Sequence, residues 1–346
     1  MKLNFLTLFF VTAILITLSC KEEITRPEEP PAGRRDYVWD VTEIKPGNES
    51  LSLGRIWGSS PQNVWAIGSS SYTATSIWHF NGSQWHCDSI PRFINPSAII
   101  GFASNEVWLG NSNSTIWKYD GMKWNRFGDY EMKGYNMLCL NYFAGTSGAN
   151  IYGVGFVELY NANKWKGVIM HYTNSKWEFV SVHETRVSFE TVALDSKSGV
   201  LVMSGTVYEP TGYVAKLYSW DGTELRELLS DFGWSFVTKL GEEIYASMNS
   251  KIYKYENKQM VLWKDNSGSG IKSNIICGRS RNDFFMGSND GIIHYNGTDF
   301  SLVYRTNINE GERVIVQRGY VFERDVFLIA IDYNSGKNRI IHGKLN

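Results

Sequence analysis

Short apolar segments recur along the chain, and a polar turn joins each one to a second apolar segment. The turns are at or near Asn-Gly or Asp-Gly, and a large apolar residue opens the segment that follows. Because type I′ turns need positive φ at two successive residues, Asn-Gly or Asp-Gly between apolar runs predicts a β-hairpin. The hairpin segments are SIWHFNGSQW (76–85), TIWKYDGMKW (115–124), VIMHYTNSKW (168–177), KLYSWDGTEL (216–225), KIYKYENKQM (251–260) and GIIHYNGTDF (291–300).

Two further β-type segments precede each hairpin, so the repeating unit contains four short strands. Before the first hairpin, for example, GRIWG (54–58) is followed by a polar turn and a β-rich run, SSPQNVWAIG (59–68). No stretch of useful length has a 3.6-residue apolar period, which excludes a helical repeat. Four strands in about every 40 residues predict an all-β fold, a β-propeller with four-stranded antiparallel blades. The residues that open the fourth strands are Trp85, Trp124, Trp177, Leu225, Met260 and Phe300, at spacings of 39, 53, 48, 35 and 40.

The number of blades follows from the two ends of the repeat region. After the sixth hairpin, three more β-type segments follow, at 314–318, 322–333 and 338–346, and the sequence then stops. The missing fourth strand is matched by YVWDVTEI (37–44), where Trp39 stands in the place of the large apolar residue. We therefore predict seven blades within residues 37–346, closed by the N-terminal strand, which would remove the open edges of the array. Six blades with an irregular cap are the alternative.

Two stretches carry a resemblance to a known class of repeats. RIWGSSPQNVWAIG (55–68) and FFMGSNDGIIHYNGTDF (284–300) resemble repeats of bacterial extracytoplasmic propellers, in particular those of the two-component-regulator type. The resemblance implies the architecture and leaves the activity open, because one propeller scaffold hosts unrelated functions. The sialidase Asp-box pattern is not matched, since Asp290 and Gly291 are adjacent where that pattern has a residue between them.

The N-terminus is predicted to be a lipoprotein signal peptide, residues 1–19. Lys2 precedes a stretch at 5–18 that is apolar except for threonines, which is too short to cross a bilayer comfortably. Ser19 before Cys20 resembles a bacterial lipobox, which implies cleavage before Cys20 and lipidation of it. The alternative is an ordinary secreted protein with a chance cysteine. The proline-rich segment that follows, within 20–36, predicts an extended tether.

The residues after Cys20 bear on location. The triplet KEE (21–23) resembles the lysine-plus-two-acids export signal of bacterial surface lipoproteins. We therefore expect an outer-membrane lipoprotein held by its lipid anchor and exposed at the surface, with a periplasm-facing protein as the alternative. The formal net charge of −1 provides no basic field for nucleic acid, and we expect a monomer. Cys87, Cys139 and Cys277 are scattered, form neither a disulfide framework nor a metal pattern, and have no role that the sequence assigns.

Few residues point to catalysis. Aligning the repeats places four histidines at one equivalent strand position in different blades, which predicts structural roles rather than a shared metal site. Asp120 and Asp221 fall in repeated turns, and no phosphate loop or nucleophile elbow occurs. We therefore assign no catalytic residue, no metal and no cofactor. The four aligned histidines are His79, His171, His294 and His342.

The widest departures from the repeat indicate a ligand surface. Extra residues between the second and third strands occur at 69–76, 156–167 and 206–216, and we expect them as loops on one face. Binding groups concentrate on loops held by a rigid scaffold. We predict a binding or assembly module for a glycan or a protein. A carbohydrate-active enzyme of glycosyl hydrolase, lyase or transferase type, with its site in the central pocket, is the alternative, and aromatic residues that merely cover the blade edge are another. The candidate ligand-binding residues are Tyr72, Tyr160, Trp165, Tyr208 and Tyr213.

Overall fold

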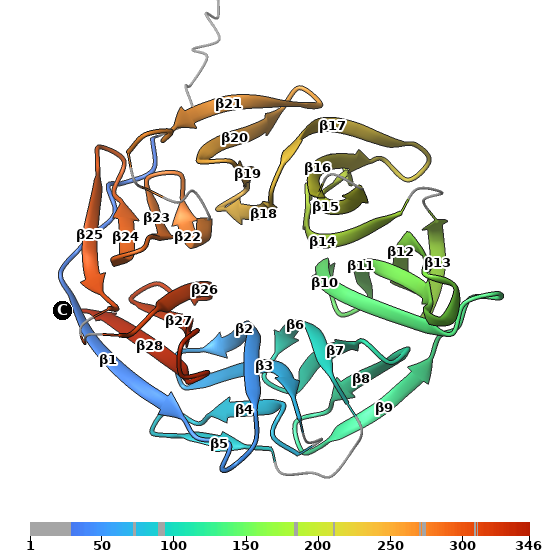
Figure 1. Cartoon of the computed structure of the whole chain (residues 1–346), viewed down its shortest axis with the longest axis horizontal. Helices are drawn as coiled ribbons and strands as arrows, with labels where there is room; N and C mark the ends of the chain where they lie inside the picture. The colour runs from blue at the N-terminus through green and yellow to red at the C-terminus, as the bar shows by residue number, and fades with distance from the viewer. Residues whose placement is uncertain are drawn as a thin grey trace, which may run out of the picture. The chain divides into compact units, whose positions relative to one another are not determined.

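Seven four-stranded antiparallel sheets form a ring (Figure 1). The structure, a computed structural model, describes residues 29–71, 74–88, 94–182, 186–209, 212–269, 271, 275–307, 309 and 311–346. The fold is an all-β propeller, as predicted, and the six-bladed alternative is wrong. Outside the strands, the described residues form turns and one short 3-10 helix, η1 (Tyr160–Ala162).

Within each blade the first strand lies nearest the ring axis and the fourth lies outermost (Figure 1). Blade 1 contains β2 (Leu51–Ser60), β3 (Asn63–Ser70), β4 (Ile77–Phe80) and β5 (Trp85–Cys87). Blade 2 contains β6 (Pro96–Ala103), β7 (Glu106–Asn111), β8 (Thr115–Tyr119) and β9 (Trp124–Asp129). Blade 3 contains β10 (Met137–Ser147), β11 (Asn150–Leu159), β12 (Lys164–Thr173) and β13 (Lys176–Val182). Blade 4 contains β14 (Val187–Leu194), β15 (Leu201–Glu209), β16 (Gly212–Trp220) and β17 (Leu225–Phe232).

The remaining three blades complete the ring. Blade 5 contains β18 (Ser235–Leu240), β19 (Glu243–Met248), β20 (Lys251–Glu256) and β21 (Gln259–Asp265). Blade 6 contains β22 (Ile275–Ser280), β23 (Asp283–Gly287), β24 (Gly291–Tyr295) and β25 (Phe300–Arg305). Blade 7 contains β26 (Val314–Val321), β27 (Asp325–Asp332), β28 (Asn338–Leu345) and, as its outermost strand, β1 (Tyr37–Ile44).

The N-terminal strand closes the ring, as the sequence predicts. β1 pairs antiparallel with β28 along eight residues, and Trp39 lies opposite Gly343. Trp124 lies opposite Tyr119 at the corresponding position of blade 2, so Trp39 occupies the predicted place. Blade 7 therefore joins the two ends of the described chain through backbone hydrogen bonds, and β28 has a partner strand on both sides.

The apolar core lies between the blades. Inward strands alternate core and non-core positions, so each sheet presents an apolar face to both neighbours. The buried apolar residues accordingly form seven clusters, each of which spans one pair of adjacent blades. Trp108, for example, is fully buried between blades 2 and 3, where its ring packs edge-on against Trp177. Blade-to-blade packing of this kind gives the ring a rigid wall.

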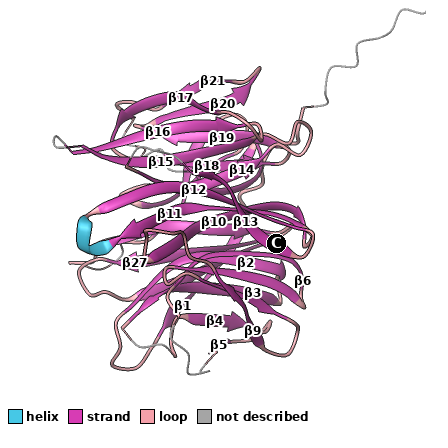
Figure 2. Cartoon of the chain, turned by 90° about the vertical axis from the view of Figure 1, so that its right-hand side faces the viewer, coloured by secondary structure: helices cyan, strands magenta, loops and turns pink. Residues whose placement is uncertain are grey.

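The ring has two faces, which are defined by the turns. At the upper face, the second strand of each blade turns into the third, and the fourth strand leads to the next blade. At the lower face, the first strand turns into the second and the third into the fourth. Figure 2 shows the ring from its side, with η1 at one edge, and this edge is the upper face. The alternation is a consequence of the antiparallel meander within each blade.

The residues just before β1 pack against the lower face. The backbone N–H of Gly33 donates to the carbonyl oxygens of Asn282 (2.9 Å) and Asn296 (3.2 Å), which both lie in lower-face turns of blade 6. Only glycine fits there, because a Cβ at this position would lie 2.7 Å from Cε1 of His294. Arg35 donates to the carbonyl of His294 and pairs with Asp299. The last residues of the predicted tether, 20–36, thus belong to the same compact unit as the blades.

Candidate functional site

A row of aromatic side chains lies on the upper face over blades 3 to 5. The ring centroids of Trp165 and Tyr208 are 5.3 Å apart, those of Tyr208 and Tyr213 are 5.0 Å apart, and those of Tyr213 and Trp234 are 5.4 Å apart. These separations are within the range of direct aromatic contact. Tyr208, Tyr213 and Trp234 are 44%, 48% and 52% exposed. We call these four residues the aromatic row.

A cation extends the aromatic row at its blade 3 end. The guanidinium carbon of Arg186 lies 4.6 Å above the ring of Trp165, and its Nη2 donates to the carbonyl of Asn163 at 2.5 Å. Such cation–π contacts favour a positive charge over the indole face. Trp165 is half-buried, and its Nε1 has no hydrogen-bond partner within the described part of the chain. The row therefore combines exposed ring faces with a positive charge, whereas the Trp165 indole N–H is buried below the surface.

Three residues of the row, Trp165, Tyr208 and Tyr213, lie at strand ends, where the sequence pattern predicted loops. Tyr208 of β15 lies opposite Tyr213 of β16, and Trp165 of β12 lies opposite Glu158 of β11. The extra residues of blades 3 and 4 thus lengthen two hairpins beyond the ring instead of forming irregular loops. Cross-strand pairing explains the contact between Tyr208 and Tyr213, because side chains that face each other across a ladder are neighbours. The contact between Trp165 and Tyr208 joins two neighbouring blades.

The predicted site residues do not all belong to the row. Tyr160 is 74% exposed in η1, and no ring contact joins it to the row. Tyr72 lies outside the described residues. Sequence reasoning missed Trp234 and Arg186, which come from the connections between blades. The sequence does contain a signal for both residues. The connections between blades lie on the same face as the long hairpins, so aromatic or charged residues in those connections can be expected next to the hairpins.

The environment of Tyr208 keeps its hydroxyl neutral. Partial burial, with smaller contributions from the charge of Glu190 and from neighbouring Tyr213 and Glu158, raises the pKa of Tyr208. Its hydroxyl therefore stays protonated at neutral pH and can donate a hydrogen bond. Glu190 belongs to the inner strand of blade 4, next to the central channel.

Polar side chains of blades 2, 3 and 4 lie along the channel wall below its upper mouth, and we call Ser97, Asn141 and Glu190 the polar belt. Six of the seven inner strands contain a β-bulge at an equivalent place, and Ser97, Asn141 and Glu190 occupy three of them. Ser97 donates to the carbonyl of Leu140 at 2.7 Å, and the Asn141 amide donates to the carbonyl of Phe189 at 2.8 Å. Each bond joins one blade to the next, so the bulges turn polar groups toward the channel wall.

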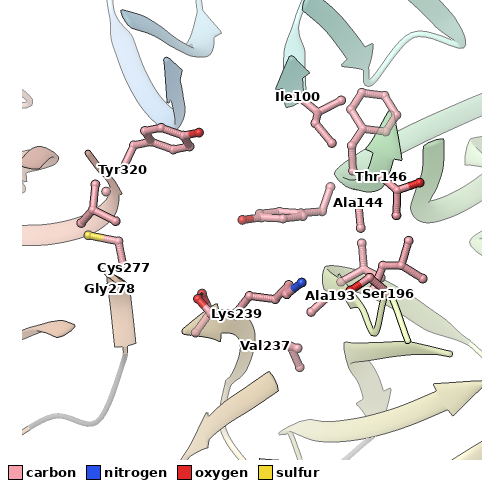
Figure 3. Close-up of a pocket in the computed structure, with 18 residues that line it drawn as sticks. Ile100, Ala144, Thr146, Ala193, Ser196, Val237, Lys239, Cys277, Gly278 and Tyr320 are labelled. Carbon is pink, nitrogen blue, oxygen red and sulfur yellow. Dashed lines mark hydrogen bonds between the residues drawn. The ribbon is translucent and has the colours of Figure 1, made fainter. Parts of the chain in front are cut away.

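A cavity of about 380 Å³ lies at the lower end of the channel. Figure 3 shows side chains from six inner strands around it, including Ile100, Val237, Lys239, Cys277 and Tyr320. A glycosidase-type site needs two converging carboxylates. None of the described residues that line this cavity carries a carboxylate. The described lining thus offers no acid pair on which to build the enzyme alternative.

The contacts of the aligned histidines and the burial of the cysteines indicate structural roles. Each aligned histidine bonds to a residue of its own blade, and no group of three metal-ligating side chains occurs among the described residues. Burial raises the pKa of Cys87 to about 11, that of Cys139 to about 12 and that of Cys277 further. The three thiols are free and, being protonated at neutral pH, are poor nucleophiles.

Within the described ranges, no helix is long and apolar enough to span a bilayer. Cys20 and residues 21–23, on which the predictions of lipidation and surface export rest, lie outside those ranges.

Comparison with known proteins bears on the fold. No family model matches the sequence, and no curated protein matches it. The chain is similar to the structure of "YCF48 bound to D1 peptide", with a TM-score of 0.61 and 12% identity over 91% of this chain and 98% of that chain. The shared fold is a β-propeller.

Two further structures agree with this. YCF48 from Cyanidioschyzon merolae has a TM-score of 0.57 and 11% identity, with coverage of 88% of this chain and 98% of that chain. The computationally designed protein Ika8 has a TM-score of 0.50 and 13% identity, with coverage of 84% and 83%. At these identities the likeness concerns the fold alone, and a propeller is consistent with a binding or assembly module.

Proposed function

We propose that this protein is a binding or assembly module that takes a segment of a partner protein along the aromatic row. The observation that carries the proposal is the row itself, four aromatic side chains in continuous contact, three of them more than two-fifths exposed. Large exposed apolar side chains gathered on one surface are typical of interaction sites. A rigid propeller wall holds them at low conformational cost, because aromatic side chains have few rotatable bonds.

The orientation of the rings favours a peptide. Trp165, Tyr208 and Tyr213 meet at steep angles of 88° and 75°, so they form notches rather than one flat floor. Aromatic-lined grooves of this kind accept extended peptide segments, with side chains between the rings. Arg186 over Trp165 adds a charge that suits an acidic residue of the partner. The similar structure of YCF48 contains a peptide, and this supports a protein ligand for a propeller of this shape.

A glycan is the second candidate ligand, and one pair of rings favours it. The rings of Tyr213 and Trp234 are only 28° from parallel, so their faces together offer a flat surface of the kind on which a sugar ring stacks. The two candidates are separable by screening, because a peptide requires the notches of the row and a sugar requires the flat pair.

We further propose that the module works on the bacterial cell surface, held by lipid at Cys20. The support is sequence-based: a short apolar core, Ser19 before Cys20, and the triplet 21–23 with its resemblance to a surface-export signal. Lipid anchors of two or more chains hold firmly, because each buried CH₂ contributes about 0.8 kcal/mol.

The test is a peptide-display screen and a glycan array on the full-length protein, followed by Tyr208→Ala combined with Trp234→Ala. Loss of two ring contacts should weaken binding by about tenfold or more. Both side chains are largely exposed, so the free energy of unfolding should change by about 1 kcal/mol or less.

Tyr333→Ala is the matched control. Tyr333 is 55% exposed in an upper-face turn of blade 7, on a part of the ring distant from the aromatic row. Its replacement by alanine should therefore leave the affinity for the ligand unchanged. If the double variant binds as tightly as the parent, the row is not the site.

A further inference from the structure

Two arginine side chains extend across the channel inside the polar belt. Arg55 starts from β2 in blade 1, and its Nε and Nη2 donate to the carbonyl of Asn141 in blade 3 at 3.2 and 2.9 Å. Arg318 starts from β26 in blade 7, and its guanidinium carbon lies 4.4 Å from the ring centroid of Phe236 in blade 5. In each case one blade lies between the two that are bridged. The two guanidinium groups therefore stand in the channel itself.

Among the described residues, no carboxylate side chain forms an ion pair with either of these two arginines. The remaining donor bonds of Arg55 and Arg318 go to the carbonyls of Gly54 and Gln317, both at 2.9 Å, and Nε of Arg318 is buried with no hydrogen-bond partner. Burial lowers the pKa of both guanidinium groups, and the charge of Arg55 lowers that of Arg318 further. Arginine nonetheless stays protonated at neutral pH.

The carboxylate of Glu190 interacts electrostatically with both guanidinium groups. Burial raises its pKa, although the arginines and a hydrogen bond from Ser188 oppose the rise. Two cations thus face one carboxylate whose ionisation burial disfavours. A buried charge without a counter-charge is costly, and the cost falls when an anion binds beside it.

A cavity leads to this charge from the upper face. Arg55 lines a space of about 220 Å³ between blades 1 and 2, which is smaller than the pockets that enclose a drug-sized ligand. The space suits one functional group rather than a whole molecule. Arginine presents parallel N–H donors that match the two oxygens of a carboxylate, and hydroxyl groups can complete such a shell. The other polar residues of the wall are Ser52, Ser69, Asn95, Ser97 and Ser112.

We propose that the upper mouth of the channel is an oxyanion site, in which Arg55 binds a carboxylate that enters the serine-lined cavity, while the nearby charge of Arg318 adds to the attraction. The carboxylate belongs either to a small free acid or to a peptide. The proposal stands independently of the aromatic row, because it rests on the channel residues alone.

The experiment measures carboxylate affinity of the full-length protein by calorimetry at fixed ionic strength. The probes are sodium acetate, a short peptide with a free C-terminal carboxylate, and the same peptide as its amide. The acid peptide should bind and the amide should bind at least about tenfold more weakly, since charge-assisted bonds are lost. Binding of acetate as tightly as the acid peptide would assign the site to small free acids.

Two variants of charged channel residues test the site through their effect on carboxylate affinity. Arg318→Gln should weaken binding, because it removes a positive charge close to Arg55. Glu190→Gln, which keeps the shape of the side chain and removes any competing negative charge, should leave binding as tight as in the parent or make it tighter. Arg126→Gln is the matched control, because Arg126 is exposed and pairs with Asp129 outside the channel. The proposal is overturned if no probe binds saturably, or if Glu190→Gln weakens binding. The second variant decides the matter even where Arg318→Gln does not fold.

Discussion

At the scale of single residues, one polar contact recurs in six of the seven blades. A residue of the third strand bonds to the residue that opens the second strand of the same blade, at 2.6 to 2.8 Å. The sequence alignment predicted that the histidines occupy one repeated position, and the structure confirms it. Each contact ties the lower ends of two neighbouring strands together. The pairs are His79 with Asn63, Lys118 with Glu106, His171 with Asn150, Lys254 with Glu243, His294 with Asp283, and His342 with Asp325.

Asp283 is the most consequential member of these pairs. Nε2 of His294 lies 2.8 Å from its Oδ1, and Arg279 pairs with it at 3.1 Å. Burial would raise the pKa of Asp283, but the hydrogen bond from His294 and the charge of Arg279 outweigh it, so the pKa is lowered. A lowered pKa means that the carboxylate stabilises the fold above the ordinary carboxyl range, and that this contribution is lost as pH falls through the folded value.

Asp283→Asn should therefore destabilise the protein in a pH-dependent way. At pH 7 the loss should be about 3–5 kcal/mol, as when one partner of a buried pair is removed. Below about pH 4, where the unfolded carboxyl is protonated, the difference from the parent should shrink. Urea unfolding at pH 7 and pH 3 measures both values.

Asp129→Asn provides the control for this prediction. Asp129 also pairs with an arginine, but at an exposed site, where such a pair contributes about 0–1 kcal/mol. A loss for Asp283→Asn that is no larger than the loss for Asp129→Asn would show that the pair with His294 does not hold blade 6.

At the scale of elements, the closing strand β1 joins the two ends of the ring by completing blade 7. Its register was readable from the sequence because six complete hairpins fixed where the large apolar residue of a fourth strand stands. Trp39 packs against Tyr304 and Phe285, at centroid distances of 5.4 and 6.4 Å. Gly343 leaves room for it, since a Cβ there would lie 2.6 Å from Cζ3 of the indole.

A double-mutant cycle tests this packing. Trp39→Ala should cost about 3 kcal/mol or more, comparable to Trp124→Ala in blade 2. Gly343→Ala should cost about 1–3 kcal/mol by overpacking. Because the added methyl fills space that the missing indole leaves, the double variant should be more stable than the sum of the losses predicts, by about 1 kcal/mol. Chemical unfolding of the four proteins measures the coupling.

The control for the cycle is Gly343→Ala combined with Trp124→Ala. These sites belong to different blades and should be additive. Strict additivity of Trp39→Ala with Gly343→Ala would mean that the indole of Trp39 does not pack on β28.

The site was less readable than the strands, for physical reasons. Comparing the repeats shows where extra residues interrupt the regular spacing, and those insertions contain Trp165, Tyr208 and Tyr213, which were predicted as ligand-binding residues. They do not indicate which residue of a neighbouring blade lies next to them, so Trp234 was missed. The belt was also missed, because a bulge shifts the alternation of side chains at one residue, as at Glu190, and one sequence gives no sign of that shift.

At the scale of the whole ring, the aromatic row and the start of the described chain lie on opposite faces. Gly33 bonds to lower-face turns of blade 6, whereas the row stands at upper-face hairpins of blades 3 and 4 and the connection after them. Strands of eight to ten residues separate the two faces by about 30 Å. If Cys20 carries lipid, as we propose, the chain between Cys20 and Pro31 spans at most about 40 Å. The described chain joins the ring at its lower face, opposite the aromatic row, and we therefore predict that the row points away from the membrane.

Energy transfer to an acceptor lipid tests this orientation. The full-length lipidated protein, incorporated into vesicles that contain a rhodamine lipid, is labelled at Met122→Cys in a lower-face turn or at Asn161→Cys in η1 on the upper face. Both sites are exposed, and the three native thiols should label slowly because burial raises their pKa. Transfer should be stronger from position 122, since the attached face lies nearer the lipid. Adding Cys20→Ala to either labelled protein should abolish transfer by removing the anchor. Equal transfer, or stronger transfer from position 161, would contradict an outward-facing row, and transfer that survives Cys20→Ala would contradict lipidation at that residue.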